Sequence, residues 1–316
     1  MSEPLQNLTL GFDPSECEIV LDGLTKDYGN GRGIFDISLR IPKGKTVGYC
    51  GTNGAGKTTT LRHIMGFLKP NKGNVLVHNT NPWTSQFSSF RNHIGYCPGE
   101  INFPLVENGT EFLKLQAEML GLNDMEKANR YINMLQLDPT ASLRRMSKGM
   151  KQKTALVACF MHSPELILLD EPTTGLDPLM REAFLEILEE AKSSGATILM
   201  SNHMFDELDI SCDYVAFIDA GHITDVVDMN SIHNRGFREY RLSFFDMDSY
   251  NEFKQSYPKV SRSEDRLLTL VVRVDMEDTQ AFLTLLRRFY LKALTEIPYS
   301  LERYFLQKHG GFADEK

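Results

Sequence analysis

The residues with the clearest chemical meaning form a glycine-rich loop, residues 51–59, which reads Gly-Thr-Asn-Gly-Ala-Gly-Lys-Thr-Thr. A strand-like run, 46–50, precedes it and a helical run, 60–65, follows it, which is the context of a P-loop that binds a nucleoside triphosphate. Its backbone N–H groups and the positive end of the helix surround phosphate oxygens. Lys57 is expected to reach the β- and γ-phosphates, and Thr58 to bind Mg²⁺. The other phosphate-binding residues expected in the loop are Asn53, Gly54, Ala55, Gly56 and Thr59.

A second group of residues with a chemical role, a pair of carboxylates, follows an apolar strand. Residues 166–169 are Leu-Ile-Leu-Leu, and they lead into Asp170 and Glu171. In P-loop ATPases the aspartate at this strand end holds Mg²⁺, so we expect Asp170 to be a metal ligand. Glu171 is placed one residue further along, where it can polarise the water that attacks the γ-phosphate. The loop and the carboxylate pair together predict hydrolysis of a bound nucleoside triphosphate.

Five motifs in this order resemble the nucleotide-binding subunit of ABC transporters. They are the P-loop, a signature-like segment 146–150 (Met-Ser-Lys-Gly-Met), the strand that ends in Asp170 and Glu171, the segment 174–177 (Thr-Gly-Leu-Asp), and His203. The match covers about residues 17 to 225. The resemblance implies an α/β fold with a P-loop NTPase core of the ABC ATPase type, with ATP as the nucleotide and Mg²⁺ as the cofactor.

The resemblance also implies roles for single residues. An aromatic residue at the position of Tyr28 stacks on adenine in the family, and aromatic faces suit base stacking. A histidine at the position of His203 contacts the γ-phosphate and orients the attack. The resemblance therefore implies that Lys57, Glu171 and His203 form the catalytic set, and that Asp177 belongs to the nucleotide-binding residues.

The signature-like segment departs from the family's commonest form, Leu-Ser-Gly-Gly-Gln. Lys148 replaces the first glycine and Met150 the final glutamine, whereas Ser147 and Gly149 are retained. In the family the retained positions touch the γ-phosphate of ATP held by a second subunit. Ser147 is also a good N-cap, and the helix N-terminus that it opens favours an anion. A capped helix without any ligand is the alternative interpretation of this segment.

A second departure follows the predicted strand 94–97, where the family usually has a glutamine. This chain reads Pro98-Gly99-Glu100 at that point. Similar Pro-Gly-Glu or Pro-Glu-Glu forms occur in the exporter branch that includes drug, bacteriocin-immunity and polysaccharide systems. Glu100 either replaces the glutamine in sensing Mg²⁺ or water, or belongs to a simple acidic turn, and the sequence leaves both interpretations open.

Composition narrows the possible partners. The chain has 316 residues, which favours two domains, and its 41% hydrophobic and 24% charged residues are typical of a globular protein. A net charge of −8 without a lysine or arginine block argues against nucleic acid as the main partner. The five cysteines never form a C-x-x-C pair, which favours reduced core thiols over disulfides or a metal site. No apolar stretch approaches the roughly 18 residues that span a bilayer.

The predicted elements divide the chain into three parts. Residues 1–16 are expected to form a flexible acidic leader. Residues 17–228 alternate strands and helices around the P-loop, which predicts an α/β ATP-binding domain with a mainly parallel sheet and a helical insertion at about 105–160. The further strands expected in this domain are 19–21, 34–41, 74–78, 197–200 and 214–218. Residues 229–316 show alternating strand patterns and then helical spacing, which predicts a small α+β C-terminal domain.

We therefore expect the ATP-hydrolysing subunit of an ABC transporter, and more specifically of an exporter. It would pair head to tail with an identical or homologous ATP-binding subunit and act on a separate transmembrane permease at the cytoplasmic face of the cell membrane. The permease is expected to dock a helix between the helical insertion and residues 100–108. Two alternatives remain, a soluble ABC ATPase without a transport role and an ATP-binding sensor that does not hydrolyse. The single P-loop and the lack of sustained heptads argue against the first, and Lys57, Asp170, Glu171 and His203 against the second.

Overall fold

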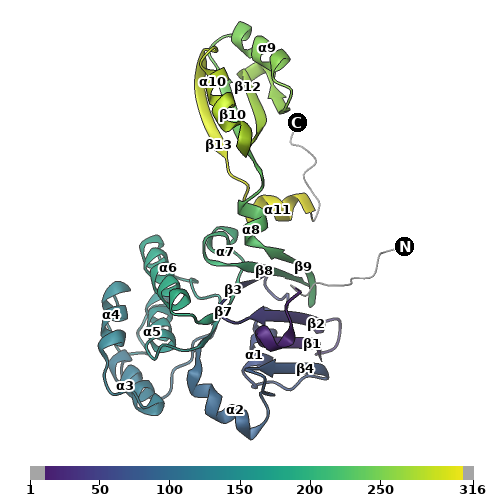
Figure 1. Cartoon of the computed structure of the whole chain (residues 1–316). Coiled ribbons are helices and arrows are strands. Elements are labelled where there is room, and N and C mark those ends of the chain that lie inside the picture. Colours follow the sequence, from purple (N-terminus) through teal and green to yellow (C-terminus); the bar gives the residue numbers. More distant parts are fainter. Residues whose placement is uncertain (1–10, 309–316) are drawn as a thin grey trace. The chain divides into compact units, whose positions relative to one another are not determined.

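Two compact units make up the chain, one ending at Asp228 and the other beginning at Met229. The structure is a computed structural model that describes residues 11–308, and each unit is described by itself (Figure 1). No helix in this described range combines the length and the apolar character that crossing a membrane requires.

The segment expected to be a loose leader is partly ordered. Its first ten residues lie outside the described part of the chain. Further along, Pro14–Glu16 form a short 3-10 helix, η1, which the Asp13 side chain caps. The Arg40 guanidinium also donates a hydrogen bond to the Phe12 carbonyl oxygen. Residues 13–16 of the expected leader therefore have a defined local conformation, which the Asp13 cap and the Arg40 side chain hold.

The main sheet of the first unit brings the expected chemistry to one edge. It has six strands in the order β5-β6-β7-β3-β8-β9, of which the first five are parallel and β9 is antiparallel to β8. β3, β6 and β7 are buried along their whole length, as continuous apolar runs predict for central parallel strands. The sequence prediction includes all of these strands except β9. Their bounds are β3 (Thr46–Cys50), β5 (Ile94–Cys97), β6 (Leu166–Asp170), β7 (Thr197–Asn202), β8 (Tyr214–Asp219) and β9 (His222–Asp228).

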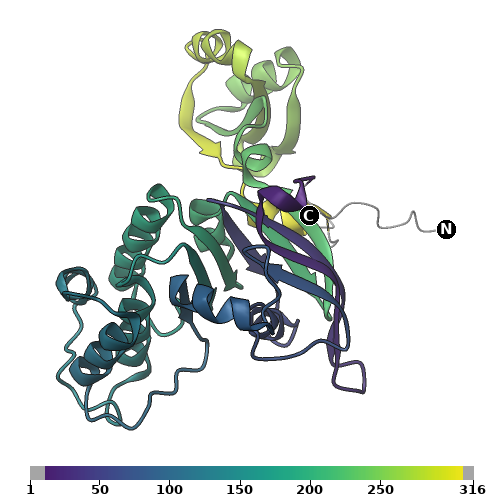
Figure 2. The same cartoon turned by 60° about the horizontal axis from the view of Figure 1, so that its bottom comes forward.

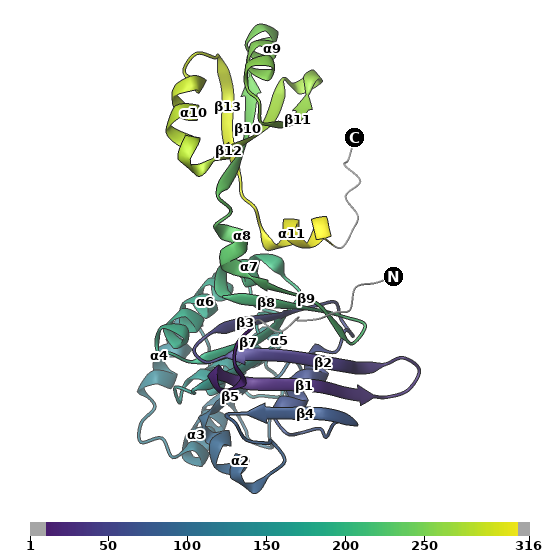
Figure 3. The same cartoon turned by 45° about the vertical axis from the view of Figure 1, so that its right-hand side comes forward.

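A second sheet in the same unit is antiparallel, with the order β2-β1-β4 (Figure 3). Its strands are β1 (Cys17–Asp27), β2 (Gly33–Pro42) and β4 (Lys72–Val77). The sequence predicts the three strands but not their separate sheet, because a strand pattern reports burial and not the neighbouring strand. Ile19, Leu39 and Val75 of this sheet share one hydrophobic core with Tyr49 and Leu168 of the main sheet.

Three helices form the expected insertion, and Figures 1 and 2 show them gathered at one end of the first unit. They are α3 (Gly109–Leu120), α4 (Glu126–Met134) and α5 (Lys148–Phe160). The side chains of Asn108 and Ser147 accept amide hydrogen bonds at the starts of α3 and α5, which explains where these two helices begin. The remaining helices of the unit are α1 (Lys57–Ile64), α2 (Ser85–Phe90), η2 (Arg91–His93), α6 (Pro178–Ser193) and α7 (Phe205–Ser211).

The second unit is a small α+β domain, as predicted. Its antiparallel sheet has the order β11-β12-β10-β13. Leu242 and Val272 of the sheet pack with Phe253 and Phe282 of two helices, so one face of the sheet is covered and holds the core. The elements are α8 (Met229–His233), β10 (Phe237–Phe244), α9 (Met247–Ser256), β11 (Val260–Glu264), η3 (Asp265–Leu267), β12 (Thr269–Asp275), η4 (Met276–Asp278), α10 (Thr279–Leu286), β13 (Leu291–Ile297) and α11 (Leu301–Lys308).

Candidate nucleotide-binding site

The P-loop connects β3 to α1 along a tight path. Because α1 begins at Lys57, the unpaired N–H groups of its first turn adjoin the loop. Gly56 has a φ of 116°, and a Cβ there would come within 2.5 Å of Ile34 Cγ2. A Cβ at Gly51 would come within 2.3 Å of the Ile218 carbonyl oxygen. Both positions therefore require glycine, one for backbone conformation and both for space.

Lys57 is held inside the loop by oxygen atoms. Its side chain is only 5% exposed, and Nζ donates to the carbonyl oxygens of Gly51 at 2.7 Å and Thr52 at 3.2 Å. Nζ also lies 3.3 Å from Glu171 Oε1. These partners offset the cost of burying an ammonium group. A phosphate oxygen carries the same sign of charge as the Glu171 carboxylate, so the arrangement suits Lys57 as a ligand for phosphate.

Thr58 and Asp170 provide two adjacent oxygen ligands. Thr58 Oγ1 donates to Asp170 Oδ2 at 2.7 Å, and Ser201 Oγ donates to Asp170 Oδ1 at 2.6 Å. Asp170 is 2% exposed at the end of β6, so these bonds satisfy a carboxylate that is largely removed from water. Mg²⁺ prefers such oxygens and usually takes one or two from the protein, with water and phosphate completing its shell. Thr58 and Asp170 therefore suit Mg²⁺. The described residues contain no cluster of three or more His, Cys, Asp or Glu that could hold a metal ion with protein ligands alone.

Glu171 leaves β6 in an uncommon backbone conformation. Its φ is 49°, in the left-handed region that residues other than glycine seldom adopt. Its N–H donates to the carbonyl and hydroxyl oxygens of Ser201, each at 3.1 Å, which fixes this turn. Glu171 Oε1 lies 3.8 Å from Nδ1 of His203, which follows β7. The structure thus brings Lys57, Glu171 and His203 together at the edge where the parallel strands end.

A pocket of about 270 Å³ opens beside the P-loop. The Tyr28 ring in its wall is 55% exposed, so ring surface is available for stacking. Ala55 is buried instead, and its carbonyl oxygen accepts a hydrogen bond from the Gly221 amide, so it supports the loop without lining the pocket. The lining residues are Tyr28, Arg32, Gly33, Asn53, Gly54, Gly56, Lys57, Thr58, Thr59 and Glu171.

Besides Ala55, three of the expected nucleotide-binding residues lie outside this pocket, namely Ser147, Gly149 and Asp177. Ser147 Oγ accepts an amide hydrogen bond at 3.2 Å in the first turn of α5, and Asp177 Oδ1 accepts one at 3.0 Å in the first turn of α6. A Cβ at Gly149 would come within 2.6 Å of the Gly175 carbonyl oxygen, so these two segments pack backbone against backbone. Within a single chain, Ser147 and Asp177 are therefore helix caps and Gly149 is a close-packing residue.

Gly99, rather than Glu100, adjoins the Asp170 carboxylate. A Cβ at Gly99 would lie 3.2 Å from Asp170 Oδ2. Burial, followed by the charge of Asp170, raises the pKa of Tyr96 in β5 to about 12. Glu100 itself is exposed and does not line the P-loop pocket. This position favours the interpretation of Glu100 as part of an acidic turn.

Two residues of the site are missing from the sequence prediction. Arg32 lines the pocket from the turn between β1 and β2. Ser201 holds both the Asp170 carboxylate and the Glu171 amide from the neighbouring strand. The only available signals are a basic residue in the glycine-rich turn after Tyr28 and a hydroxyl residue two positions before His203. Neither signal is specific without the fold.

Known proteins resemble a large part or nearly all of this chain. The family model described as ABC transporter matches residues 34–174. The uncharacterized ABC transporter ATP-binding protein YhcH of Bacillus subtilis (strain 168) is 28% identical over 93% of this chain and 97% of that protein. The bacitracin transport ATP-binding protein BcrA of Bacillus licheniformis is 30% identical over 70% of this chain and 73% of that protein.

A solved structure agrees with these relatives. It is described as the structure of the ATP binding subunit of an ABC transporter, and it superposes with a TM-score of 0.60 at 28% identity. The match covers 69% of this chain and 92% of that structure. The residues that the family model matches, 34–174, all lie in the first unit and include the P-loop and the β6 carboxylates. The chain therefore belongs to the ATP-binding proteins of ABC transporters, and its first unit is an ABC ATPase domain.

Proposed function

We propose that this chain is the ATP-hydrolysing subunit of an ABC exporter that works as a head-to-tail dimer on a separate membrane permease. One observation carries the proposal. Lys57, Thr58 and Glu171 line one pocket, whereas Ser147 and Gly149 lie outside it in their own chain. A second chain that brings these two residues to the pocket completes the site.

ATP binding would use the open side of the pocket. The exposed Tyr28 ring suits stacking on adenine, and Arg32 lies in the same wall with a positive charge. Lys57 and the first turn of α1 suit the phosphates. A phosphate group next to Lys57 would also release Glu171 from its 3.3 Å ion pair and free that carboxylate for chemistry.

Thr58 Oγ1 and Asp170 Oδ2 are the residues that would hold Mg²⁺. The ion would supply neutralisation of the phosphate charge that grows during transfer. Ser201 keeps the Asp170 carboxylate oriented from the second oxygen. The protein's own contribution is therefore to fix two oxygens at the end of β6 and the start of α1.

Hydrolysis would begin when the oxygen of a water molecule attacks the γ-phosphorus and the Glu171 carboxylate accepts a proton from that water. The bond from the γ-phosphorus to the bridging oxygen breaks, and ADP and phosphate result. His203 approaches the same carboxylate from the end of β7, where it can orient the attacked phosphate. Catalysis on this scheme is mainly positioning and charge neutralisation.

The start of α5 supports an anion from outside the chain. Ser147 caps the helix, and its first turn contains no acidic residue. Lys148, Lys151 and Lys153 lie near this end instead, although positive charge is unfavourable at a helix N-terminus. A phosphate group of ATP bound to a second chain would compensate both the helix dipole and these lysines.

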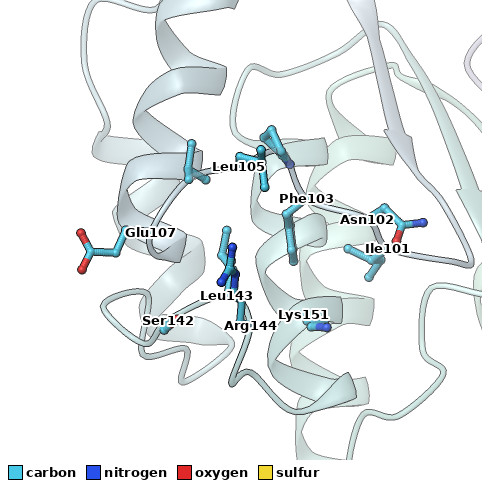
Figure 4. A pocket seen from close by; sticks show the side chains of 11 residues that line it. Ile101, Asn102, Phe103, Leu105, Glu107, Ser142, Leu143, Arg144 and Lys151 are labelled. Atoms are coloured by element: carbon cyan, nitrogen blue, oxygen red, sulfur yellow. The ribbon is translucent and has the colours of Figure 1, made fainter.

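A groove on the first unit suits the permease. It has a volume of about 540 Å³ and is lined by residues 101–107, residues 142–144 and Lys151 (Figure 4). Leu105 in its wall is 95% exposed, and Arg144 and Lys151 add positive charge. We expect a cytoplasmic helix of the permease to bind here, with apolar side chains toward Leu105 and an acidic residue toward the two cations.

The direction of transport is inferred from the relatives. A protein named for bacitracin transport is 30% identical to this chain, which favours an exporter of the drug-transport type. We propose that the permease also holds this chain at the cytoplasmic face of the membrane.

The decisive variant is Glu171→Gln. Removing the general base should lower turnover by about 10²- to 10⁴-fold, while ATP binding persists and an ATP-bound dimer accumulates. Phosphate release and size-exclusion chromatography with Mg²⁺ and ATP measure the two effects. Glu186→Gln, an exposed glutamate on α6, is the matched control and should behave as the wild type.

The same trapped variant tests the partners. Purified from detergent-solubilised membranes with ATP, it should retain a membrane protein in a complex that contains two ATP-binding subunits. Turnover equal to the wild type would contradict the role of Glu171. A trapped dimer without any membrane protein would instead favour an ABC ATPase without a transport role.

A further inference from the structure

One buried carboxylate near the site has no part in the scheme above. Glu207 lies in the first turn of α7 and is 6% exposed. It does not line the P-loop pocket. A carboxylate that is almost fully removed from water is costly unless its oxygens are satisfied. Its partners therefore indicate what the position is for.

One oxygen of Glu207 joins two segments that carry site residues. Thr173 Oγ1 donates to Oε2 at 2.7 Å, and Asn202 Nδ2 donates to the same oxygen at 2.5 Å. Thr173 lies two residues after Glu171, and Asn202 directly precedes His203. Glu207 thus connects the turn after β6 to the turn after β7.

Asn202 links Glu207 to the backbone of His203. Its Oδ1 accepts the backbone N–H of His203 at 2.7 Å and that of Met204 at 3.0 Å. The orientation of the Asn202 amide therefore decides the path of the backbone that carries the imidazole. Because Glu207 accepts a hydrogen bond from the other end of the same amide, a shift of its carboxylate would move His203.

The second carboxylate oxygen of Glu207, Oε1, faces a positively charged side chain beyond hydrogen-bond distance. Arg181 Nε, in the first turn of α6, lies 3.9 Å from Glu207 Oε1, and neither buried atom has a hydrogen-bond partner. The pair compensates charge without forming a bond. α6 begins directly after Asp177, so a movement of about 1 Å at this helix start is enough to close the pair to hydrogen-bond distance.

We propose that Glu207 is a positioning residue that fixes His203 relative to Glu171, and that Arg181 couples this position to the segment ending at Asp177. The inference rests on the proposed catalytic roles of Glu171 and His203. Glu207 acts only through Asn202 and Thr173, so it should affect kcat and leave nucleotide binding unchanged.

The test compares Glu207→Ala with Glu207→Gln. The glutamine keeps one oxygen for Thr173 and Asn202, whereas the alanine removes it. We expect the alanine variant to lose about 10- to 100-fold in kcat with KM for ATP within about twofold of wild type, and the glutamine to restore most of that loss. Hydrogen exchange of the peptide that contains His203 and Met204 should accelerate in the alanine variant and remain slow in the glutamine variant.

Further variants keep the test decisive. Combined with His203→Ala, Glu207→Ala should cost no additional turnover, because it acts through the histidine. If the alanine variant does not fold, Thr173→Val, which removes one hydroxyl, should still accelerate exchange at His203. Wild-type exchange and kcat in the alanine variant would overturn the inference, as would an additional loss on top of His203→Ala. Failure of the proposed function would appear elsewhere, as full turnover in Glu171→Gln.

Discussion

The first unit has two sides that satisfy their polar groups in different ways. The P-loop side carries Lys57, Thr58, Asp170 and Glu171, and the signature side carries Ser147 and Asp177 at the starts of two helices. On the P-loop side the functional groups pair with one another, Lys57 with Glu171 and Thr58 with Asp170. On the signature side, Ser147 and Asp177 pair only with amides at the starts of α5 and α6. The first side is a charged network, and the second is a pair of capped helix ends.

This difference shows what each side needs from a ligand. On the P-loop side the charged and polar groups already pair with one another within the chain. A phosphate group or a metal ion therefore has to replace one of these partners. The start of α5 is not balanced, since its nearby side chains add positive charge to the positive end of the dipole. In the proposed head-to-tail dimer, the phosphate-loaded pocket of a second chain would supply the missing anion.

The largest expected effect comes from mixing two inactive variants, one defective on the P-loop side and the other on the signature side. Lys57→Ala disables the P-loop side and Ser147→Ala the signature side, so each homodimer carries a defect in both of its sites. In a head-to-tail mixed dimer, one site carries both defects and the other carries none. Equal mixing should therefore restore phosphate release to about a quarter of wild type, for random pairing of independent sites.

A matched mixture serves as the control. Lys57→Ala and Glu171→Gln both lie on the P-loop side, so every site of their mixed dimer carries one defect. That mixture should stay inactive at any ratio. Recovery there, or none with Ser147→Ala, would contradict the division of the site between two chains.

A smaller effect is expected at Tyr28, on the edge of the P-loop side. Stacking of a base on an aromatic ring contributes about 1–3 kcal/mol, so Tyr28→Ala should raise KM for ATP by about 5- to 150-fold with kcat little changed. Tyr28→Phe keeps the ring and should stay within about twofold. Steady-state kinetics with ATP measure both variants.

Tyr290→Ala is the control for losing an exposed aromatic ring, because this residue of the second unit is also exposed (67%, against 55% for Tyr28). It should leave KM unchanged. An unchanged KM in Tyr28→Ala would show that adenine does not stack there, and would leave Arg32 as the residue to examine in that wall.

The P-loop side was largely predictable from sequence, and the reason is topological. Lys57, Asp170 and His203 each follow an apolar run that the sequence identifies as a strand. Carboxyl ends of parallel strands meet at one edge of a sheet, so the strand prediction already implies that these residues converge. The structure confirms the parallel order of β6, β7 and β3 that this argument needs.

Side-chain contacts across neighbouring strands and turns were not predictable. Ser201 reaches Asp170 because β6 and β7 pair with Asp170 opposite Ser201, and no local pattern reports that register. Glu207 reads as an ordinary acidic residue of a helix start until its contacts with Thr173 and Asn202 are known. The antiparallel sheet of β1, β2 and β4 was missed for the same reason, since strand patterns do not identify neighbours.

The smallest predicted effect separates the two roles open to Ser147. As an N-cap, its replacement by alanine should lower the free energy of unfolding by about 1 kcal/mol, and Ser147→Asp should restore it because aspartate is an equally good cap. Turnover should not recover in the aspartate variant, because a carboxylate there repels the γ-phosphate of the opposite chain. Denaturant unfolding and phosphate release, measured on the same three proteins, follow the two properties separately. If aspartate restored turnover together with stability, Ser147 would be only a cap, and the signature side would lose its direct contact with ATP.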